Sequence, residues 1–179
     1  CAVVTSHLSM CPTCLDELRS MESIGVALFE ELEPVKTDVD APHLGTIAAD
    51  DRSDQATANA DGDVPSPLVD VIGSSLDSLA WQQLGPEIWN FTIPMTAHLK
   101  GDLRMIKLGP GGKLPEHKHE GEELILVLRG SCRIGTSAFK TGDFAEFDDE
   151  NKDSMIAEQE GCILLIGNEA MPAFIAQLN

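Results

Sequence analysis

The sequence predicts a mainly β protein whose β domain, a sandwich or barrel, is preceded by a short α-helical region. Short apolar runs separated by Gly, Pro and Asp clusters recur from residue 67 onward, a pattern typical of sandwiches and barrels. An apolar run with helical spacing precedes them, and an acidic segment without aromatic residues lies between the two parts. We therefore expect a helical region in 1–32, a linker in 33–66 and a barrel in 67–179.

The N-terminal region is predicted to be helical from the spacing of its apolar residues. They recur mostly at intervals of three and four positions, which is the period of one helix face. Acidic and polar residues fill the other positions, and Pro34 closes the run. The apolar residues are Leu15, Leu18, Met21, Ile24, Val26, Leu28 and Phe29.

The segment 33–66 is rich in Asp, Ala, Ser and Pro. Such a composition cannot bury enough apolar surface to offset the entropy that is lost when the chain becomes ordered. We expect a flexible acidic linker here, in which His43 is solvated.

The net charge of −18 comes from 30 acidic and 12 basic residues. This field repels phosphate backbones, so direct binding of nucleic acid is not expected. It is compatible with a basic protein partner, or it serves solubility alone. No run approaches the ~20 apolar residues of a membrane span, and no secretory leader is expected. Because the sequence starts at Cys1 rather than at Met, we expect a longer protein with a preceding segment.

The chain contains five cysteines, two of them in a C-x-x-C pair. An odd number in this arrangement does not fit a secreted disulfide framework, so we expect a cytoplasmic protein in which at least one pair serves metal or redox chemistry. Cys132 and Cys162 lie in predicted strands and are expected to be small buried residues. Trp81 and Trp89 are expected to pack the first strands of the barrel.

A first candidate metal site lies at His7, Cys11 and Cys14. The spacing of four and three residues places all three on one face of a helix, and thiolates with imidazole are preferred zinc ligands. Structural zinc needs a fourth ligand, either Cys1 or a residue upstream. Two alternatives remain open, a thioredoxin-type redox pair, for which no βαβ unit is visible, and two small core cysteines.

A second candidate site lies at His117, His119 and Glu123. Residues i and i+2 of a strand share a face, so the two histidines point the same way, and Glu123 returns to that side after a turn at Gly121. Two imidazoles and a carboxylate inside a barrel form an open three-ligand site that suits Zn(II), Mn(II) or Fe(II).

The spacing of these three residues between Gly111 and Gly130 resembles the first cupin motif. This resemblance implies a cupin, or jelly-roll, barrel. The second cupin motif normally supplies a further histidine, and Asp153 stands in its place. Asp153 is either a fourth ligand, which would favour harder metals such as Mn(II), or a surface acid at a lost ligand position.

The stretch HLSMCPTC resembles the H-x-x-x-C-x-x-C signature of zinc-binding anti-sigma factors. Together with the acidic linker and the cupin motif, it resembles the ChrR-type anti-sigma factors over the whole chain apart from the linker. The resemblance implies that the helical region sequesters an extracytoplasmic-function sigma factor. It also implies that the cupin domain ends this inhibition under oxidative stress, caused by singlet oxygen or peroxide. Since cupins often pair through strands, a homodimer is compatible with the resemblance.

Two other functions remain open from the residues alone. Two histidines and a carboxylate in a barrel also serve metal-dependent cupin enzymes, dioxygenases or isomerases, in which the metal activates oxygen or polarises a carbonyl. A cupin that binds a small ligand without turnover is the third possibility. The zinc signature at the N-terminus favours regulation, because a cupin enzyme would not need it.

Overall fold

A computed structural model describes residues 1–33, 63–95, 101–115, 121–148 and 154–168. The helices are α1 (Ala2–Met10), α2 (Pro12–Glu30), α3 (Ser66–Ile72) and the 3-10 turn η1 (Leu76–Ser78). The strands are β1 (Gln82–Gly85), β2 (Ile88–Thr92), β3 (Asp102–Leu108), β4 (Lys113–Leu114), β5 (Glu123–Ile134), β6 (Ser137–Lys140), β7 (Phe144–Phe147) and β8 (Met155–Asn168). The mainly β fold with N-terminal helices is as the sequence predicts.

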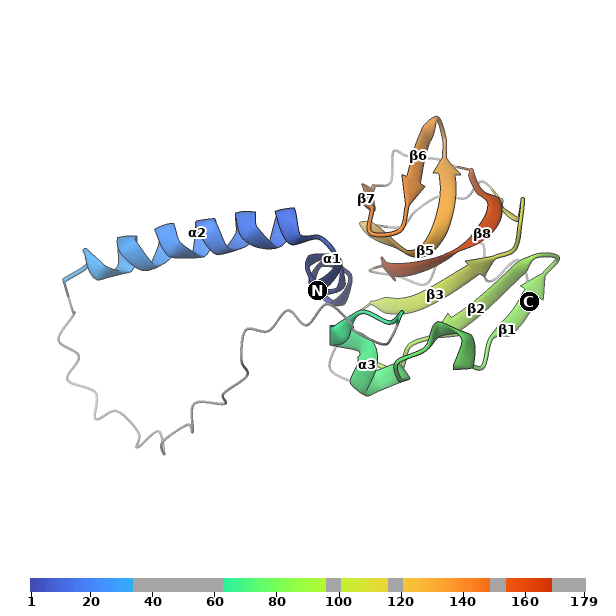
Figure 1. Ribbon diagram of the computed structural model, residues 1–179, viewed down its shortest axis with the longest axis horizontal. Helices are drawn as coiled ribbons and strands as arrows, with labels where there is room; N and C mark the ends of the chain where they lie inside the picture. The colour runs from blue at the N-terminus through green and yellow to red at the C-terminus, as the bar shows by residue number, and fades with distance from the viewer. Residues whose placement is uncertain (34–62, 96–100, 116–120, 149–153, 169–179) are drawn as a thin grey trace.

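The strands form one antiparallel sheet in the order β1-β2-β3-β8-β5-β6, with β4 paired to β8 and β7 paired to β5. Figure 1 shows the curled sheet with β5, β6 and β7 at one end, β1 and β2 at the other, and β8 and β3 between them. The two longest strands, β5 and β8, pair along most of their length. They form the centre of the sheet, and both are buried on both faces for much of their length.

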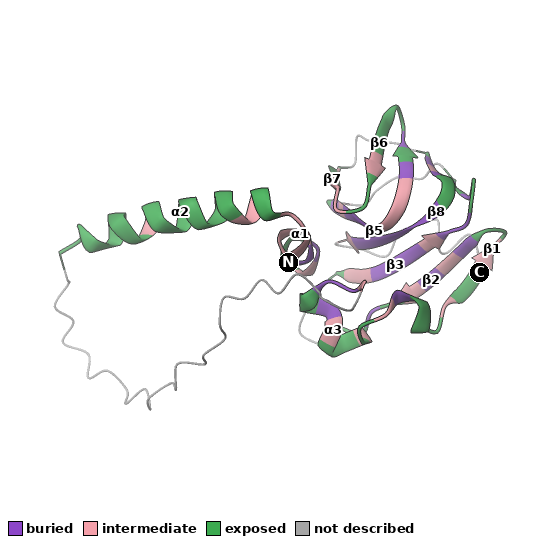
Figure 2. Ribbon diagram, in the orientation of Figure 1, coloured by how far each residue is buried: buried purple, intermediate pink, exposed green. Residues whose placement is uncertain are grey.

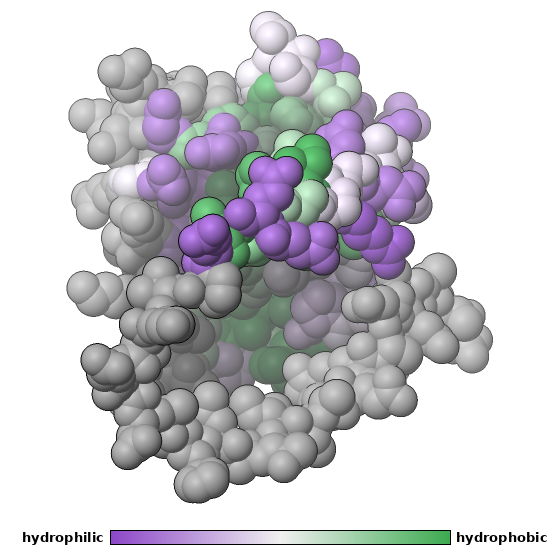
Figure 3. Space-filling view, turned by 90° about the vertical axis from the view of Figure 1, so that its left-hand side faces the viewer, coloured by the Kyte–Doolittle hydropathy of each residue, from purple (hydrophilic) through white to green (hydrophobic). Residues whose placement is uncertain are grey.

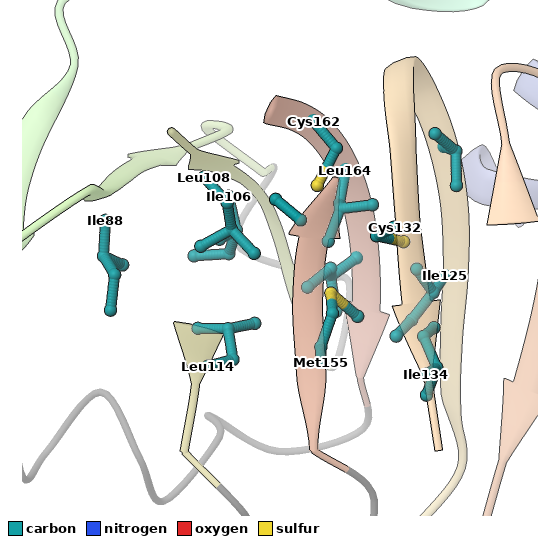
Figure 4. Close-up of a cluster of buried hydrophobic side chains, with 13 residues drawn as sticks. Ile88, Ile106, Leu108, Leu114, Ile125, Cys132, Ile134, Met155, Cys162 and Leu164 are labelled. Carbon is teal, nitrogen blue, oxygen red and sulfur yellow. The ribbon is translucent and has the colours of Figure 1, made fainter. Parts of the chain in front are cut away.

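Alternation along the strands divides the core into two clusters, because successive side chains point to opposite faces of a sheet. The inner cluster, on the concave side of the curled sheet, contains Ile125 and Val127 of β5. The outer cluster, on the side covered by helices, contains Leu126 and Leu128 of the same strand. Figure 4 shows the inner cluster, in which side chains from β2, β3, β4, β5 and β8 gather within the curled sheet. Helices cover the outer cluster.

Helix α1 packs on the outer face of the sheet together with α3. Val3 is fully buried in the outer cluster, which also contains Val64 and Leu68 from the segment that leads into the barrel. Residues of α1 contact both β5 and β8. The predicted division into 1–32, 33–66 and 67–179 stays a prediction, since most of the linker lies outside the described residues, but α1 shares its core with the barrel.

The helical region is broken at Cys11, although the spacing of His7, Cys11 and Cys14 predicts one continuous helix. Cys11 has an extended conformation and is at once the C-cap of α1 and the N-cap of α2. Pro12 causes the break, because proline disfavours the α conformation in the residue before it and has no N–H to donate. Proline is well suited to the first turn of the next helix, where it lies.

Helix α2 projects away from the barrel (Figure 1), and none of its residues is buried. Figure 2 shows it almost entirely exposed, in contrast to the strands. Seen from the side on which α2 projects, apolar residues lie at the surface among hydrophilic ones (Figure 3). No helix in the described part of the chain is long and apolar enough to cross a membrane.

Gly130 follows the apolar run ELILVLR, where a glycine predicts a turn out of the strand, but it lies at a bulge inside β5. The pairing of β5 with β8 shifts register here, and the strand continues to Ile134. A Cβ atom on Gly130 would lie 2.1 Å from the carbonyl oxygen of Gly161, and the φ angle of Gly130 is +77°. Both the close approach of β8 and the positive φ therefore require glycine.

Candidate metal centres

The N-terminal candidate site is assembled around the break between α1 and α2. His7 comes from α1, Cys11 from the junction and Cys14 from the first turn of α2. Potential ligand atoms of the three residues all lie within 4.8 Å of one another, and all three residues are partly buried. The three residues meet, although they do not share one continuous helix as their spacing alone predicts.

His7 also joins this site to the barrel. Its Nδ1 donates a hydrogen bond to the carbonyl oxygen of Gly142 over 3.0 Å, and its ring centroid lies 5.5 Å from that of Phe144. A carbonyl accepts only, so Nδ1 carries a proton, and Nε2 is the ring nitrogen that could bind a metal. Metal-binding histidines commonly donate their second ring nitrogen to a backbone carbonyl in this way, which fixes the orientation of the ring.

The two thiols of this site interact directly. A hydrogen bond to Cys11, and then desolvation, raise the pKa of Cys14 above its ordinary value. Two sulfurs and an imidazole nitrogen are a donor set that fits Zn(II). Cys1, one candidate for the fourth ligand, lies at the other end of α1, about 9 Å along the helix axis from His7.

Of the second candidate site, the structure describes Glu123. It is the first residue of β5 and is 2% exposed. It pairs with Asn168, the last residue of β8, whose Nδ2 donates a hydrogen bond to Oε2 of Glu123. His117, His119 and Asp153 lie outside the described residues, so whether they converge with Glu123 stays a prediction.

Near Glu123, two polar residues of β3, Asp102 and Arg104, lie on the inner face of the sheet, and neither was among the predicted site residues. Arg104 is 2% exposed, forms an ion pair with Asp102 and donates to Oδ1 of Asn90 over 3.3 Å. Asp102 is the cross-strand partner of Asn168, which in turn pairs with Glu123. The one available signal was the alternation of LRMIKL, which places Arg104 on the same face as Ile106.

Asn168 carries an unusual polar atom. Its Oδ1 is buried and has no hydrogen-bond partner. A buried carboxylate beside an unpaired amide oxygen is a donor set that fits a metal ion with oxygen ligands. The residues present at this end of the barrel therefore suit the predicted ion.

The comparisons with known proteins agree with this architecture. The family described as the ChrR cupin-like domain matches residues 70–172. The chain belongs to this family. It is 34% identical over 174 residues to the anti-sigma-E factor ChrR of Cereibacter sphaeroides, an alignment that covers 94% of this chain and 79% of the relative.

A solved structure is also similar. A chain of the crystal structure of Rhodobacter sphaeroides SigE in complex with the anti-sigma ChrR superposes with a TM-score of 0.73 and 30% identity. The superposition covers 93% of this chain and 86% of that chain. The similarity thus extends over the N-terminal helices as well as the barrel.

Proposed function

We propose that this chain is an anti-sigma factor that binds an extracytoplasmic-function sigma factor through its N-terminal helices. The observation that carries the proposal is the unpartnered apolar face of α2. The similarity to an anti-sigma factor and to a complex of SigE with ChrR supports it. The chain acts in the cytoplasm, where sigma factors meet RNA polymerase.

The apolar face of α2 has the dimensions of a docking surface. Met21, Ile24, Leu28 and Phe29 are 68%, 61%, 61% and 76% exposed. The helix has 19 residues and is therefore about 28 Å long. Full burial of such side chains contributes roughly 1.5–3 kcal/mol each, and a helix of this kind gains most of its stability from packing. A partner that covers this face therefore stabilises α2, and burial of the same apolar side chains provides the free energy of binding.

The charge of α2 suits a partner that binds nucleic acid. Asp16, Glu17 and Glu22 lie on the helix, and Arg19 is its one basic residue. Proteins that contact phosphate backbones carry basic surfaces. An acidic, amphipathic helix is complementary to such a surface and competes with nucleic acid for it.

We also propose two metal sites, one at the N-terminal helices and one in the barrel. His7, Cys11 and Cys14 would hold Zn(II) at the junction of α1 and α2, where the ion stabilises the local geometry of the two helices. His117, His119 and Glu123, with Asp153 as a further candidate, would hold Zn(II), Mn(II) or Fe(II) in the barrel. We propose that oxidative stress, by singlet oxygen or peroxide, acts on the barrel site or on the thiols and ends the binding of the sigma factor.

The test is capture of the sigma factor by variants of α2. The full chain and a SigE-type sigma factor of its source organism are co-expressed, and complexes are separated by size-exclusion chromatography and quantified by calorimetry. Met21→Glu and Leu28→Glu each bury a charge in the proposed interface, so we expect at least 100-fold weaker binding. Ser23→Glu adds the same charge to the opposite face of α2 and should change affinity by less than a few-fold. Equal affinities for all three variants would exclude the apolar face as the binding surface.

A further inference from the structure

We infer that Asn168 belongs to the barrel metal centre, where its amide nitrogen positions the carboxylate of Glu123 and its amide oxygen binds the ion. The inference deepens the proposed function, since it rests on the metal site proposed at Glu123. Asn168 lies at the end of β8 directly across from Glu123, and the two face each other from neighbouring strands. Neither charge nor motif marks Asn168 in the sequence.

The hydrogen bond between the two side chains defines which end of the amide faces Glu123. Nδ2 of Asn168 donates to Oε2 of Glu123. The reverse orientation would set Oδ1 against a carboxylate oxygen, and both atoms accept only. The amide orientation is therefore determined by its partner rather than by convention, and Oδ1 is left as the end of the amide that does not contact Oε2.

Oδ1 is then an acceptor without a donor. It is fully buried and has no partner, and the other such side-chain atom in the described part of the chain is Oγ of Ser6. Leaving a buried acceptor unpaired is destabilising, because nothing offsets the loss of its hydrogen bonds to water. The buried cation of this region does not relieve the cost, because Arg104 is directed to Asp102 and to Asn90.

A metal ion would supply the electrostatic partner that Oδ1 lacks. Amide and carboxylate oxygens are common ligands of hard divalent cations, and an amide that also donates to a ligating carboxylate holds that carboxylate in place. An oxygen from Asn168 adds a ligand to those that the sequence predicts. The centre should then favour five- or six-coordinate ions such as Mn(II) over tetrahedral Zn(II).

The test measures metal binding in the full-length chain with Cys11→Ser and Cys14→Ser, which removes the thiols of the N-terminal site. Mn(II) affinity is determined by electron paramagnetic resonance of the free ion, and coordination number by the intensity of the Co(II) d–d bands. Asn168→Ala should weaken Mn(II) binding about 10–100-fold and strengthen the Co(II) bands, because fewer ligands give more intense transitions. Asn168→Asp keeps an oxygen ligand and should bind within about 10-fold of the parent.

Two controls make the outcome decisive. Asn90→Ala removes another buried amide from the same face of the sheet and should leave Mn(II) affinity unchanged. Thermal unfolding of the metal-free proteins checks that Asn168→Ala folds. If Asn168→Ala binds Mn(II) as tightly as the parent while Glu123→Gln does not, the inference is wrong and the metal centre stands. If the parent binds no ion, the barrel site and the inference both fail, while capture of a sigma factor by the same samples still tests the anti-sigma proposal.

Discussion

The packing of α1 on the barrel can be tested at one contact, between Gly167 of β8 and Val3. A Cβ atom on Gly167 would lie 2.9 Å from Cγ2 of Val3 and 3.7 Å from Cδ1 of Leu103. The first distance is too short for two carbon atoms, and Val3 is fully buried, so its side chain has no free space into which to turn. Gly167→Ala should therefore push α1 away from the sheet.

The expected changes in the free energy of unfolding follow from the contact between Gly167 and Val3. Overpacking by one methyl group in a buried position costs about 1–3 kcal/mol, so we expect Gly167→Ala to lower the free energy of unfolding by that amount. Val3→Ala removes two methyl groups, about 1.6 kcal/mol of transfer free energy, and leaves a small cavity that adds to the loss. In the double variant the new Cβ occupies this cavity. The combined loss should therefore be about 1–2 kcal/mol smaller than the sum of the single losses.

Urea unfolding followed by the fluorescence of Trp81 and Trp89, both in the barrel, measures these free energies. A change of 1 kcal/mol should also move the melting temperature by about 2–4 °C. As a control, Gly167→Ala is combined with Ser23→Ala in the exposed part of α2, and this pair should be additive. If the Val3 and Gly167 losses also add within about 0.5 kcal/mol, α1 does not pack on β8 as described.

Two further predictions concern buried polar groups. Arg104→Leu should destabilise the fold by about 3 kcal/mol in urea unfolding, because it leaves Asp102 without its buried partner; a loss below 1 kcal/mol would show that the pair is not buried in solution. In the native, metal-free protein, iodoacetamide should modify the cysteines of the N-terminal helices and spare Cys132 and Cys162, both buried in the inner cluster. A hydrogen bond to Cys132, and then burial, raise the pKa of Cys162, so its thiol stays protonated and unreactive. Mass spectrometry checks this, and equal labelling of all five cysteines before unfolding would contradict it.

Local patterns predicted the strands well, and also the proximity of His7, Cys11 and Cys14. The short apolar runs correspond to β2, β3, β5, β7 and β8, and Cys132 and Cys162 are buried as expected. The spacing of His7, Cys11 and Cys14 brings them together. Spacing is sufficient here because the three residues lie within eight positions and need only one turn of chain on each side of the break.

Contacts between distant segments escaped prediction. Gly130 suggested a turn, yet its glycine is required by the carbonyl of Gly161 on a neighbouring strand, which sequence order does not reveal. Asn168 ends an apolar run and belongs to no recognisable motif. Its proposed role depends on its contact with Glu123, which lies 45 residues away in the sequence. In the same way, the sequence shows that α1 is apolar but not that Val3 is buried against β8.

The break at Cys11 could have been inferred from the sequence. Proline at position 12 directly follows the first cysteine of the motif, and the residue before a proline is biased away from the helical conformation. The apolar periodicity that predicted the helix begins at Leu15, beyond the proline. The periodicity therefore predicts a helix beyond Pro12 only, and it does not predict one that continues across Cys11.

The strand β7 lies between the two candidate metal centres. Phe147, at its end, pairs with Glu123, and Phe144, at its start, contacts the ring of His7. These residues are three positions apart, about 10 Å along a strand. His7 in turn is held by the carbonyl of Gly142, next to β7. A change in the position of Glu123 would therefore be transmitted to the junction of α1 and α2 by one short strand.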